Sequence, residues 1–230
     1  MTSTVDLEQL ARQAERELAD APATEVVRWA VQTFGPRFAV ASSMQDAVLV
    51  HLVSQVAPGV DVLFLDTGYH FAETMGTRDA VAASHDINLI TLTPRQSVAE
   101  QDAEYGPKLH ARNPDLCCGL RKVAPLDRAL ADYDAWATGV RRVEAPTRAA
   151  TPVVSYAPQR RKVKLAPLAT WSDQDVDDYI AEHAILLNPL LSVGYPSIGC
   201  APCTRAVIAG EDLRAGRWAG SGKTECGIHR

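Results

Sequence analysis

Short apolar runs alternate along the first 140 residues with longer stretches in which apolar side chains recur at helical spacing. The short runs lie at residues 38–41, 60–65, 88–92 and 135–140. The stretches of helical period cover about residues 6–19, 24–34, 47–56, 71–85, 97–104 and 123–130. Runs of this length predict buried strands, and their alternation with helices predicts an α/β fold with a doubly wound, mostly parallel sheet.

Small polar residues follow the first two predicted strands. The first is followed by Ser42 and Ser43, and the second ends in Leu65, Asp66, Thr67 and Gly68. In doubly wound sheets ligands bind beyond the carboxyl ends of the strands. A polar loop that leads into a helix also directs backbone N–H groups toward an anion. We therefore expect both segments to border one ligand site.

Arginines follow the fourth predicted strand. Arg141 and Arg142 come directly after it, and Arg148 lies six residues beyond Arg142. Because a guanidinium group pairs bidentately with tetrahedral oxyanions, this placement suits a phosphate or a sulfate. The alternative is a solvated surface cluster. The basic stretch at residues 160–164, between short strands predicted within 152–168, is interpreted as facing solvent or a partner.

The last third of the chain carries one more helix signal and a glycine-rich end. Ser172 with Asp175 resembles a capping box and predicts a helix to about His183. Arg214 and Arg217 share a face if their stretch turns helically. Glycines at 216, 220 and 222 predict flexibility. We therefore expect a single α/β domain over residues 1–215 and a flexible tail over residues 216–230.

Composition narrows the class of protein. The chain of 230 residues is 47% hydrophobic, which is ample for a packed core, and its net charge is −5. A negative chain does not suit nucleic acid or a membrane surface as partner. The sequence shows neither a run long enough to span a bilayer nor a signal-peptide pattern, so we expect a cytoplasmic protein. Five cysteines in a reducing compartment indicate metal binding or redox chemistry.

The cysteines divide into four and one. Cys117-Cys118 and the pair Cys200 and Cys203 can together close a site for zinc or for an iron–sulfur cluster. Adjacent cysteines have diverging side chains, which a cluster with separate irons accepts more readily than a single zinc ion. Cys226 is left over and is the candidate nucleophile, with Arg214, Arg217, Lys223 and His229 as positive neighbours that could lower its pKa. A thiolate is suited to attack sulfur.

With these motifs the chain resembles the assimilatory adenylyl-sulfate reductases, within the wider group of phosphoadenylyl-sulfate reductases. The matching pieces run in family order from about residue 38 to the C-terminus: Ser42-Ser43 before Gln45-Asp46, Leu65-Asp66-Thr67-Gly68, Cys117-Cys118-Gly119-Leu120-Arg121-Lys122, Trp136-Ala137-Thr138-Gly139, Gly199-Cys200-Ala201-Pro202-Cys203-Thr204-Arg205 and Glu225-Cys226-Gly227-Ile228-His229. The family usually carries a glycine and an acidic pair in its first loop, whereas this chain has Ser43-Met44-Gln45-Asp46.

The resemblance implies a fold like that of the adenine-nucleotide alpha-hydrolases, with a C-terminal catalytic tail. It implies a 4Fe-4S cluster on Cys117, Cys118, Cys200 and Cys203. It further implies that Cys226 attacks the sulfur of adenylyl sulfate, expelling AMP, and that thioredoxin or a similar dithiol then releases sulfite for cysteine biosynthesis. By the same resemblance the phosphosulfate is held by Lys122, Arg148, Arg214, Arg217 and His229, and the nucleotide by Ser42, Ser43 and residues 65–68.

Other readings of the sequence stay open. The paired cysteines favour the unphosphorylated nucleotide, but a phosphoadenylyl-sulfate (PAPS) reductase or an enzyme that uses both substrates is an alternative. A non-catalytic zinc-binding module would explain the four cysteines but not Cys226. An enzyme that splits ATP to AMP and pyrophosphate is expected to carry a Ser-Gly-Gly-x-Asp-Ser loop, which residues 41–46 do not supply.

Overall fold

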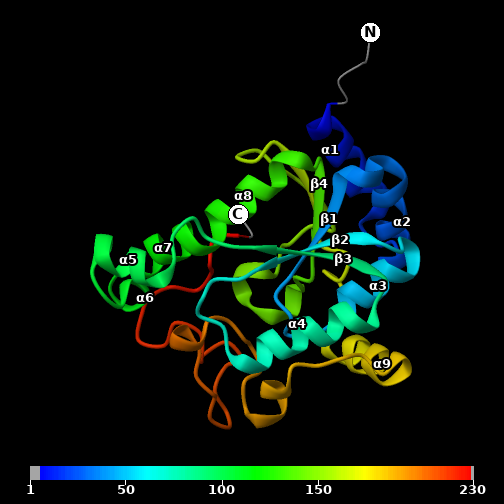
Figure 1. Ribbon diagram of the computed structural model, residues 1–230. Coiled ribbons are helices and arrows are strands. Elements are labelled where there is room, and N and C mark those ends of the chain that lie inside the picture. The colour runs from blue at the N-terminus through cyan, green and yellow to red at the C-terminus, as the bar shows by residue number, and fades with distance from the viewer. Residues whose placement is uncertain (1–5, 229–230) are drawn as a thin grey trace.

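The computed structural model describes residues 6–228, which fold around one twisted sheet (Figure 1). Within these residues six strands pair in the order β3-β2-β1-β4-β6-β5. All neighbours are parallel except β5 and β6, which pair antiparallel. The strands are β1 (Phe38–Ser42), β2 (Val60–Leu65), β3 (Ile87–Leu92), β4 (Ala135–Thr138), β5 (Val154–Ala157) and β6 (Lys162–Leu165). The predicted doubly wound, mostly parallel sheet is confirmed.

The helices connect the strands and cover both faces of the sheet. The α-helices are α1 (Leu7–Leu18), α2 (Ala23–Phe34), α3 (Val48–Val56), α4 (Ala72–Ser84), α5 (Val98–Tyr105), α6 (Leu109–Arg112), α7 (Pro114–Cys118), α8 (Ala124–Ala129) and α9 (Asp173–His183). Between α7 and α8 lies a π-helical turn, η2 (Gly119–Val123). Short 3-10 turns are η1 (Gly35–Arg37), η3 (Leu130–Asp132), η4 (Arg142–Glu144), η5 (Pro146–Arg148), η6 (Pro189–Val193) and η7 (Ala201–Cys203).

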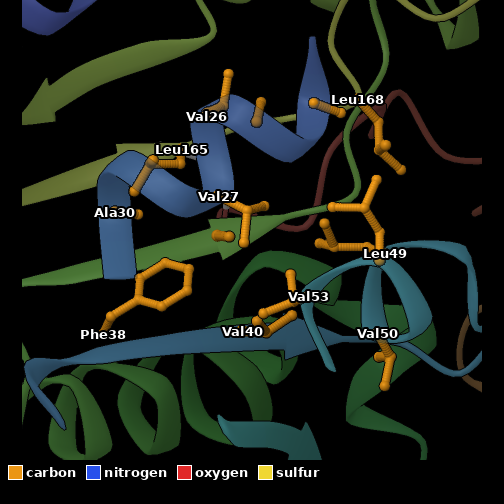
Figure 2. Packing of buried hydrophobic residues seen from close by; sticks show 14 of the residues in the cluster. Val26, Val27, Ala30, Phe38, Val40, Leu49, Val50, Val53, Leu165 and Leu168 are labelled. Carbon is orange, nitrogen blue, oxygen red and sulfur yellow. The ribbon is translucent and has the colours of Figure 1, made fainter. Parts of the chain in front are cut away.

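Alternate residues of each strand build two cores, because successive side chains point to opposite faces. Val40 of β1 and Leu165 of β6 belong to the larger core, together with Val27 of α2 and Val53 of α3. Figure 2 shows part of this cluster. Trp136 of β4 belongs to the smaller core on the other face, where it meets Ala39, Leu63, Leu126 and Leu130. Trp136 is fully buried. The sheet is therefore fixed from both sides, and its carboxyl edge stays free for a site.

Three local expectations need correction. The helix predicted from residue 24 begins one residue earlier, because α2 starts at Ala23 directly after Pro22. β4 ends at Thr138, two residues earlier than the predicted strand. The interpretation of residues 160–164 as facing solvent is wrong for the second half, because Lys162–Leu165 forms β6, an inner strand between β4 and β5.

The chain beyond residue 215 is packed against the α/β domain. The carbonyl of Gly216 accepts from the N–H of Arg205 at 3.0 Å, and the N–H of Trp218 donates to the carbonyl of Cys203 at 2.9 Å. In Figure 1 the segment runs back past α7 toward α8. Its Ile228 packs against the smaller core. The boundary predicted at residue 216 thus falls inside a paired segment.

Within residues 6–228 we find no helix that combines the length and the apolarity needed to cross a membrane.

Candidate active site

The loop after β1 is tied to a distant part of the chain. Met44 has a φ of 58°, a conformation that favours glycine, which the related family usually carries in this loop. The Nδ2 of Asn188 donates to the carbonyl of Met44 at 3.2 Å, and the N–H of Ile198 donates to Oε1 of Gln45 at 2.9 Å. These bonds hold the strained turn and bring the segment before Cys200 beside the end of β1.

A cavity of about 230 Å³ opens at the carboxyl ends of β1, β2 and β4. Several residues that the sequence predicted for the site line it: Ser42, Ser43, Leu65, Thr67, Lys122, Arg141, Arg148, Arg214, Arg217 and Cys226. Residues separated by up to 184 positions in the chain therefore meet in one place. This is the edge of the sheet at which a doubly wound fold binds its ligand.

Four other predicted residues are placed differently. Arg142 is not among the residues that line the cavity, since its Nε donates to the carbonyl of Thr151 at 2.8 Å. Asp66 and Gly68 also lie outside the lining and form a turn in which Oδ1 of Asp66 accepts from the N–H of Gly68 at 2.9 Å. His229 falls outside the residues that the structure describes.

Several polar residues of the cavity were not predicted. They are Gln45, Asp46, His70, Thr138, Glu144, Asp173 and Ser197, with Trp218 beside them. Burial raises the pKa of Asp46, although the N–H of Val48 donates to its carboxylate at 3.0 Å. Of this group, Gln45-Asp46 and Thr138 stood inside recognised motifs. The others lie in segments of ordinary composition, so only the fold could show that they reach the site.

Polar atoms of the cavity lining lack partners within the described part of the chain. Oγ1 of Thr138, Nη1 of Arg141, Nε of Arg217 and Nδ1 of His70 are all buried there without a hydrogen bond. Buried polar groups are nearly always satisfied in native proteins, and each exception needs an explanation. Because all four line one cavity, the simplest explanation is a polar ligand that supplies the missing partners.

His70 is set up as a neutral hydrogen-bond acceptor. Its Nε2 lies 2.7 Å from the carbonyl of Leu65, which can only accept, so Nε2 carries the proton. Burial lowers the pKa of His70, although its contact with the Leu65 carbonyl opposes the shift. At neutral pH Nδ1 is therefore unprotonated and can accept from a ligand N–H or O–H group.

The end of the cavity at Cys226 is positively charged. Nη1 of Arg217 donates to Oγ of Ser197 at 3.1 Å and to the carbonyl of Ile198 at 3.2 Å. Nη1 of Arg214 lies 3.4 Å from the same Ser197 hydroxyl. The described residues around 214–217 do not form a helix, but both arginines still converge on one point. Burial lowers the pKa of both groups, yet arginine stays charged at any accessible pH.

Glu225, next to Cys226, fastens the tail over the cavity. Its carboxylate accepts from Nε of Arg148 at 2.7 Å and from Nη2 of the same arginine at 2.9 Å. Arg214 adds a donor to the backbone carbonyl of Thr224 at 3.0 Å and lies 3.4 Å from the Glu225 carboxylate. The Arg148 and Glu225 side chains are only 12% and 19% exposed, so the pair is well shielded from solvent. The Arg148–Glu225 pair therefore acts as a latch that fixes the position of the neighbouring Cys226 thiol.

The four remaining cysteines line a separate, small cavity. Cys117 and Cys118 are the last residues of α7, and adjacent side chains on a helix point in different directions. The π-helical turn that follows changes the direction in which Arg121 and Lys122 point. Oγ1 of Thr67 lies 3.2 Å from Sγ of Cys200. Burial raises the pKa of Cys117 to about 12, and the negative charges of the other three thiols add to the shift. The four sulfurs therefore lie close enough to act on one another.

A cluster fits these four thiols better than a single ion does. Among residues 6–228 no group of three or more His, Cys, Asp or Glu side chains is placed closely enough to hold a single metal ion. The thiols instead line a common space, and an iron–sulfur cluster takes its cysteine ligands on separate irons. Four thiols, three of them buried, with no acidic oxygen among the lining residues also form the soft donor set that such a cluster requires.

Lys122 and Trp218 stand between the two cavities and line both of them. Burial alone would lower the pKa of Lys122, but the charges of Cys200 and Cys226 outweigh this effect and raise it. The guanidinium carbon of Arg217 lies 4.5 Å from the centre of the Trp218 ring, a cation–π contact. Lys122 thus stays positively charged at a place where it can attract the Cys226 thiolate and a bound anion.

Comparison with known proteins identifies the family. Residues 36–206 match the family model of the phosphoadenosine phosphosulfate reductase domain. The chain belongs to this family. It is 66% identical over 227 residues to the adenosine 5′-phosphosulfate reductase of Streptomyces coelicolor, covering 99% of this chain and 96% of that one. It is 57% identical over 224 residues to the enzyme of the same name from Mycolicibacterium smegmatis, covering 97% of this chain and 95% of the relative.

Solved structures agree with membership of the phosphoadenosine phosphosulfate reductase family. The crystal structure of phosphoadenylyl-sulfate (PAPS) reductase from Candida auris, a phosphate complex, superimposes with a TM-score of 0.74 at 31% identity, covering 87% of this chain and 97% of that chain. FMN adenylyltransferase from Candida glabrata superimposes with a TM-score of 0.56 at 11% identity, covering 87% and 74%, and shares the fold alone. The matched region 36–206 ends before Cys226, so the segment that carries Cys226 is covered by the near full-length relatives rather than by the family model.

Proposed function

We propose that this chain is a thioredoxin-dependent adenylyl-sulfate reductase, which converts adenosine 5′-phosphosulfate to sulfite and AMP. The observation that carries the proposal is the meeting of Cys226 with Lys122, Arg214 and Arg217 in one cavity that still lacks partners for four buried polar atoms. A thiol beside several cations suits attack on a negatively charged sulfur compound. The names of the relatives in Streptomyces coelicolor and Mycolicibacterium smegmatis support the same substrate.

We assign each end of the cavity to one end of the substrate. The cationic end, with Arg217 and Lys122, receives the phosphosulfate, and the end beside β1 and β2 receives the nucleoside. The neutral His70 offers Nδ1 there as an acceptor for an N–H or O–H group of the nucleoside. Thr138 Oγ1 offers a further partner on the floor formed by β4.

The reaction proceeds by displacement at sulfur. The Cys226 thiolate attacks the sulfate sulfur, an S–S bond forms, and the bond from that sulfur to the bridging phosphate oxygen breaks, so that AMP leaves with the electron pair. The fixed positive charges of Arg217 and Lys122 stabilise the negative charge that develops on both groups. A dithiol of the thioredoxin type then reduces the cysteine S-sulfonate, releasing sulfite and restoring Cys226.

We further propose that Cys117, Cys118, Cys200 and Cys203 hold a 4Fe-4S cluster. When bound, the cluster adds a charged group behind Lys122 and Trp218. Lys122 connects the two sites because it lines both cavities. The soft set of four thiols, three of them buried, supports this assignment.

Intact mass measured after anaerobic purification tests the proposal. Protein with an intact cluster is incubated with adenylyl sulfate, without reductant, and the experiment is repeated with the 3′-phosphorylated nucleotide. We expect a sulfonate adduct on the wild type, and none on Cys226→Ser. Cys203→Ser, whose side chain does not line the substrate cavity, reports separately on the cluster.

The two nucleotides decide the substrate. An adduct with adenylyl sulfate alone supports the assigned activity, whereas an adduct with the 3′-phosphorylated nucleotide alone assigns the chain to PAPS reduction. If neither nucleotide modifies wild-type protein whose iron and sulfide contents are complete, the proposed reaction is wrong.

A further inference from the structure

Charged side chains of alternating sign form a row along the substrate cavity. They are linked pair by pair, and all of them line the cavity: Arg214, Glu225, Arg148, Glu144, Arg141 and Asp173. The Arg214 guanidinium lies 3.4 Å from the Glu225 carboxylate, which accepts from Nε of Arg148 at 2.7 Å. On its other side Arg148 donates from Nη1 to Glu144 at 2.5 Å. The first two arginines of the row are therefore neutralised by carboxylates.

The other end of the row is built around Arg141. Its Nη2 lies 2.9 Å from the Asp173 carboxylate, and its Nε lies 3.8 Å from that of Glu144. Glu144 also accepts from the backbone N–H of Arg141 at 3.0 Å. The Arg141 and Glu144 side chains are only 15% and 22% exposed, so salt and water screen their charges incompletely. Two carboxylates thus share this arginine, and the row ends in the negative charge of Asp173, the first residue of α9.

Two cations of the cavity stand outside the row. The described part of the lining holds five cations, and three of them are the arginines of the row. The others are Lys122 and Arg217, and no carboxylate of residues 6–228 forms an ion pair with either; the charges that act on them come from thiols and arginines. The phosphosulfate of adenylyl sulfate carries one negative charge on phosphorus and one on sulfur. The two unpaired cations therefore match the charge of this substrate.

A 3′-phosphate on the nucleotide has no cation left to pair with. It adds a charge of about −1.5 to −2 at neutral pH. Only C5′, C4′ and C3′ of the ribose separate the 5′ oxygen from the 3′ oxygen, so this phosphate lies near the phosphosulfate and not at the adenine. Arg141 follows Thr138 of β4, on the side of the cavity that we assign to the nucleoside. The carboxylates beside it, Glu144 and Asp173, have the same sign as the added phosphate.

We propose that Glu144 and Asp173 select adenylyl sulfate against its 3′-phosphorylated relative. The inference rests on the proposed function and adds to it the residues that determine the substrate. The two carboxylates neutralise Arg141 and repel a second phosphate. A free 3′-hydroxyl can donate a hydrogen bond to a carboxylate, whereas a dianionic 3′-phosphate has no proton to donate. Specificity of this kind rests on a repulsive element as well as on attractive contacts.

Arg141 would become available to the 3′-phosphate if its two partners lost their charge. Its Nη1 is buried and already lacks a hydrogen-bond partner within the described part of the chain. A guanidinium group pairs well with phosphate oxygens. Removal of the two carboxylate charges should therefore add use of the second nucleotide and not merely weaken the site.

Neutral substitutions test the selection. Glu144→Gln and Asp173→Asn keep the shape of each side chain and remove its charge, and a double variant removes both charges. Asp177→Asn is the control, because Asp177 is exposed one turn further along α9 and does not line the cavity. Each protein, with complete iron and sulfide contents, is mixed without reductant with a low concentration of either nucleotide. Rapid quench and intact mass then give the second-order rate constant of Cys226 sulfonation, and the ratio of the two constants is the selectivity.

We expect the wild type and Asp177→Asn to prefer adenylyl sulfate by the same factor. This preference should fall at least about threefold in Asp173→Asn and at least about tenfold in Glu144→Gln and in the double variant, because the less exposed carboxylate is less screened. Calorimetric binding of adenosine 3′,5′-bisphosphate relative to AMP should follow the same order. The binding measurement decides the question for any variant that is sulfonated too slowly.

An unchanged preference in the folded double variant, or an equal fall in Asp177→Asn, would overturn selection by Glu144 and Asp173. A wild type without preference for adenylyl sulfate would overturn it as well, although its sulfonate adduct would still support the displacement at sulfur. Absence of an adduct on the wild type with either nucleotide would instead mean that the proposed function has failed.

Discussion

Replacing Gly199 with alanine should displace the arginine that we assign to the phosphosulfate. A Cβ at Gly199 would lie 2.4 Å from Nη2, 2.7 Å from Cζ and 2.9 Å from Nε of Arg217. The guanidinium is the movable partner and must shift by about 1 Å to reach an ordinary contact of 3.4 Å. Its bonds to Ser197 at 3.1 Å and to Ile198 at 3.2 Å then no longer fit.

A displacement of this size at a substrate-positioning group lowers the rate by on the order of 100-fold. We expect that loss in the single-turnover rate of Cys226 sulfonation, measured by rapid quench and intact mass. The thermal unfolding midpoint should fall by about 4–8 °C, since the lost hydrogen bonds are worth about 2 kcal/mol, so the variant is assayed well below that temperature. Gly222→Ala, in the tail, is the control, because nothing lies within 4 Å of a Cβ there. Wild-type sulfonation by a folded Gly199→Ala protein would refute the assignment of Arg217.

Three further substitutions test other parts of the site. Lys122→Met should slow sulfonation at least about tenfold while iron and sulfide contents stay complete; equal loss of both would show that Lys122 serves only the cluster. Glu225→Gln breaks the shielded pair with Arg148, at a cost of about 3 kcal/mol. Alkylation of Cys226 by iodoacetamide should therefore accelerate, while the midpoint of global unfolding in urea stays near that of the wild type. An unchanged rate of alkylation would contradict the role of the Arg148–Glu225 pair as a latch. Burial lowers the pKa of Lys164 to about 8, below the value of 10.5 for the unfolded chain. Between these values the unfolded chain binds more protons, so stability rises with pH, by about 1 kcal/mol from pH 7 to pH 9; Lys164→Met should lose that increment in urea titrations, and an identical slope in both proteins would refute it.

The sequence was sufficient to predict the sheet because each inner strand carries its own signal. Residues 60–65 form an apolar run buried on both faces, and β2 indeed lies between β3 and β1. β6 was not recognised as an inner strand, since Lys162 and Lys164 alternate with apolar residues and resemble a solvent-facing segment. Lys162 instead reaches the carbonyl of Tyr133, and Lys164 is half-buried between β4 and β5. Long stems allow lysine to lie along a buried strand, a placement that residue type alone does not reveal.

The site residues likewise divide into those that the sequence could predict and those that only the fold reveals. Cysteines are rare and their spacing is distinctive, so their grouping into four and one could be predicted. Residues such as Ser197 and His70 have no such signal, because what matters is their position relative to Arg217 or Leu65 across the fold. Arg142 carried the same signal as Arg141 but turns toward Thr151, because Arg141 is extended whereas Arg142 begins the 3-10 turn η4.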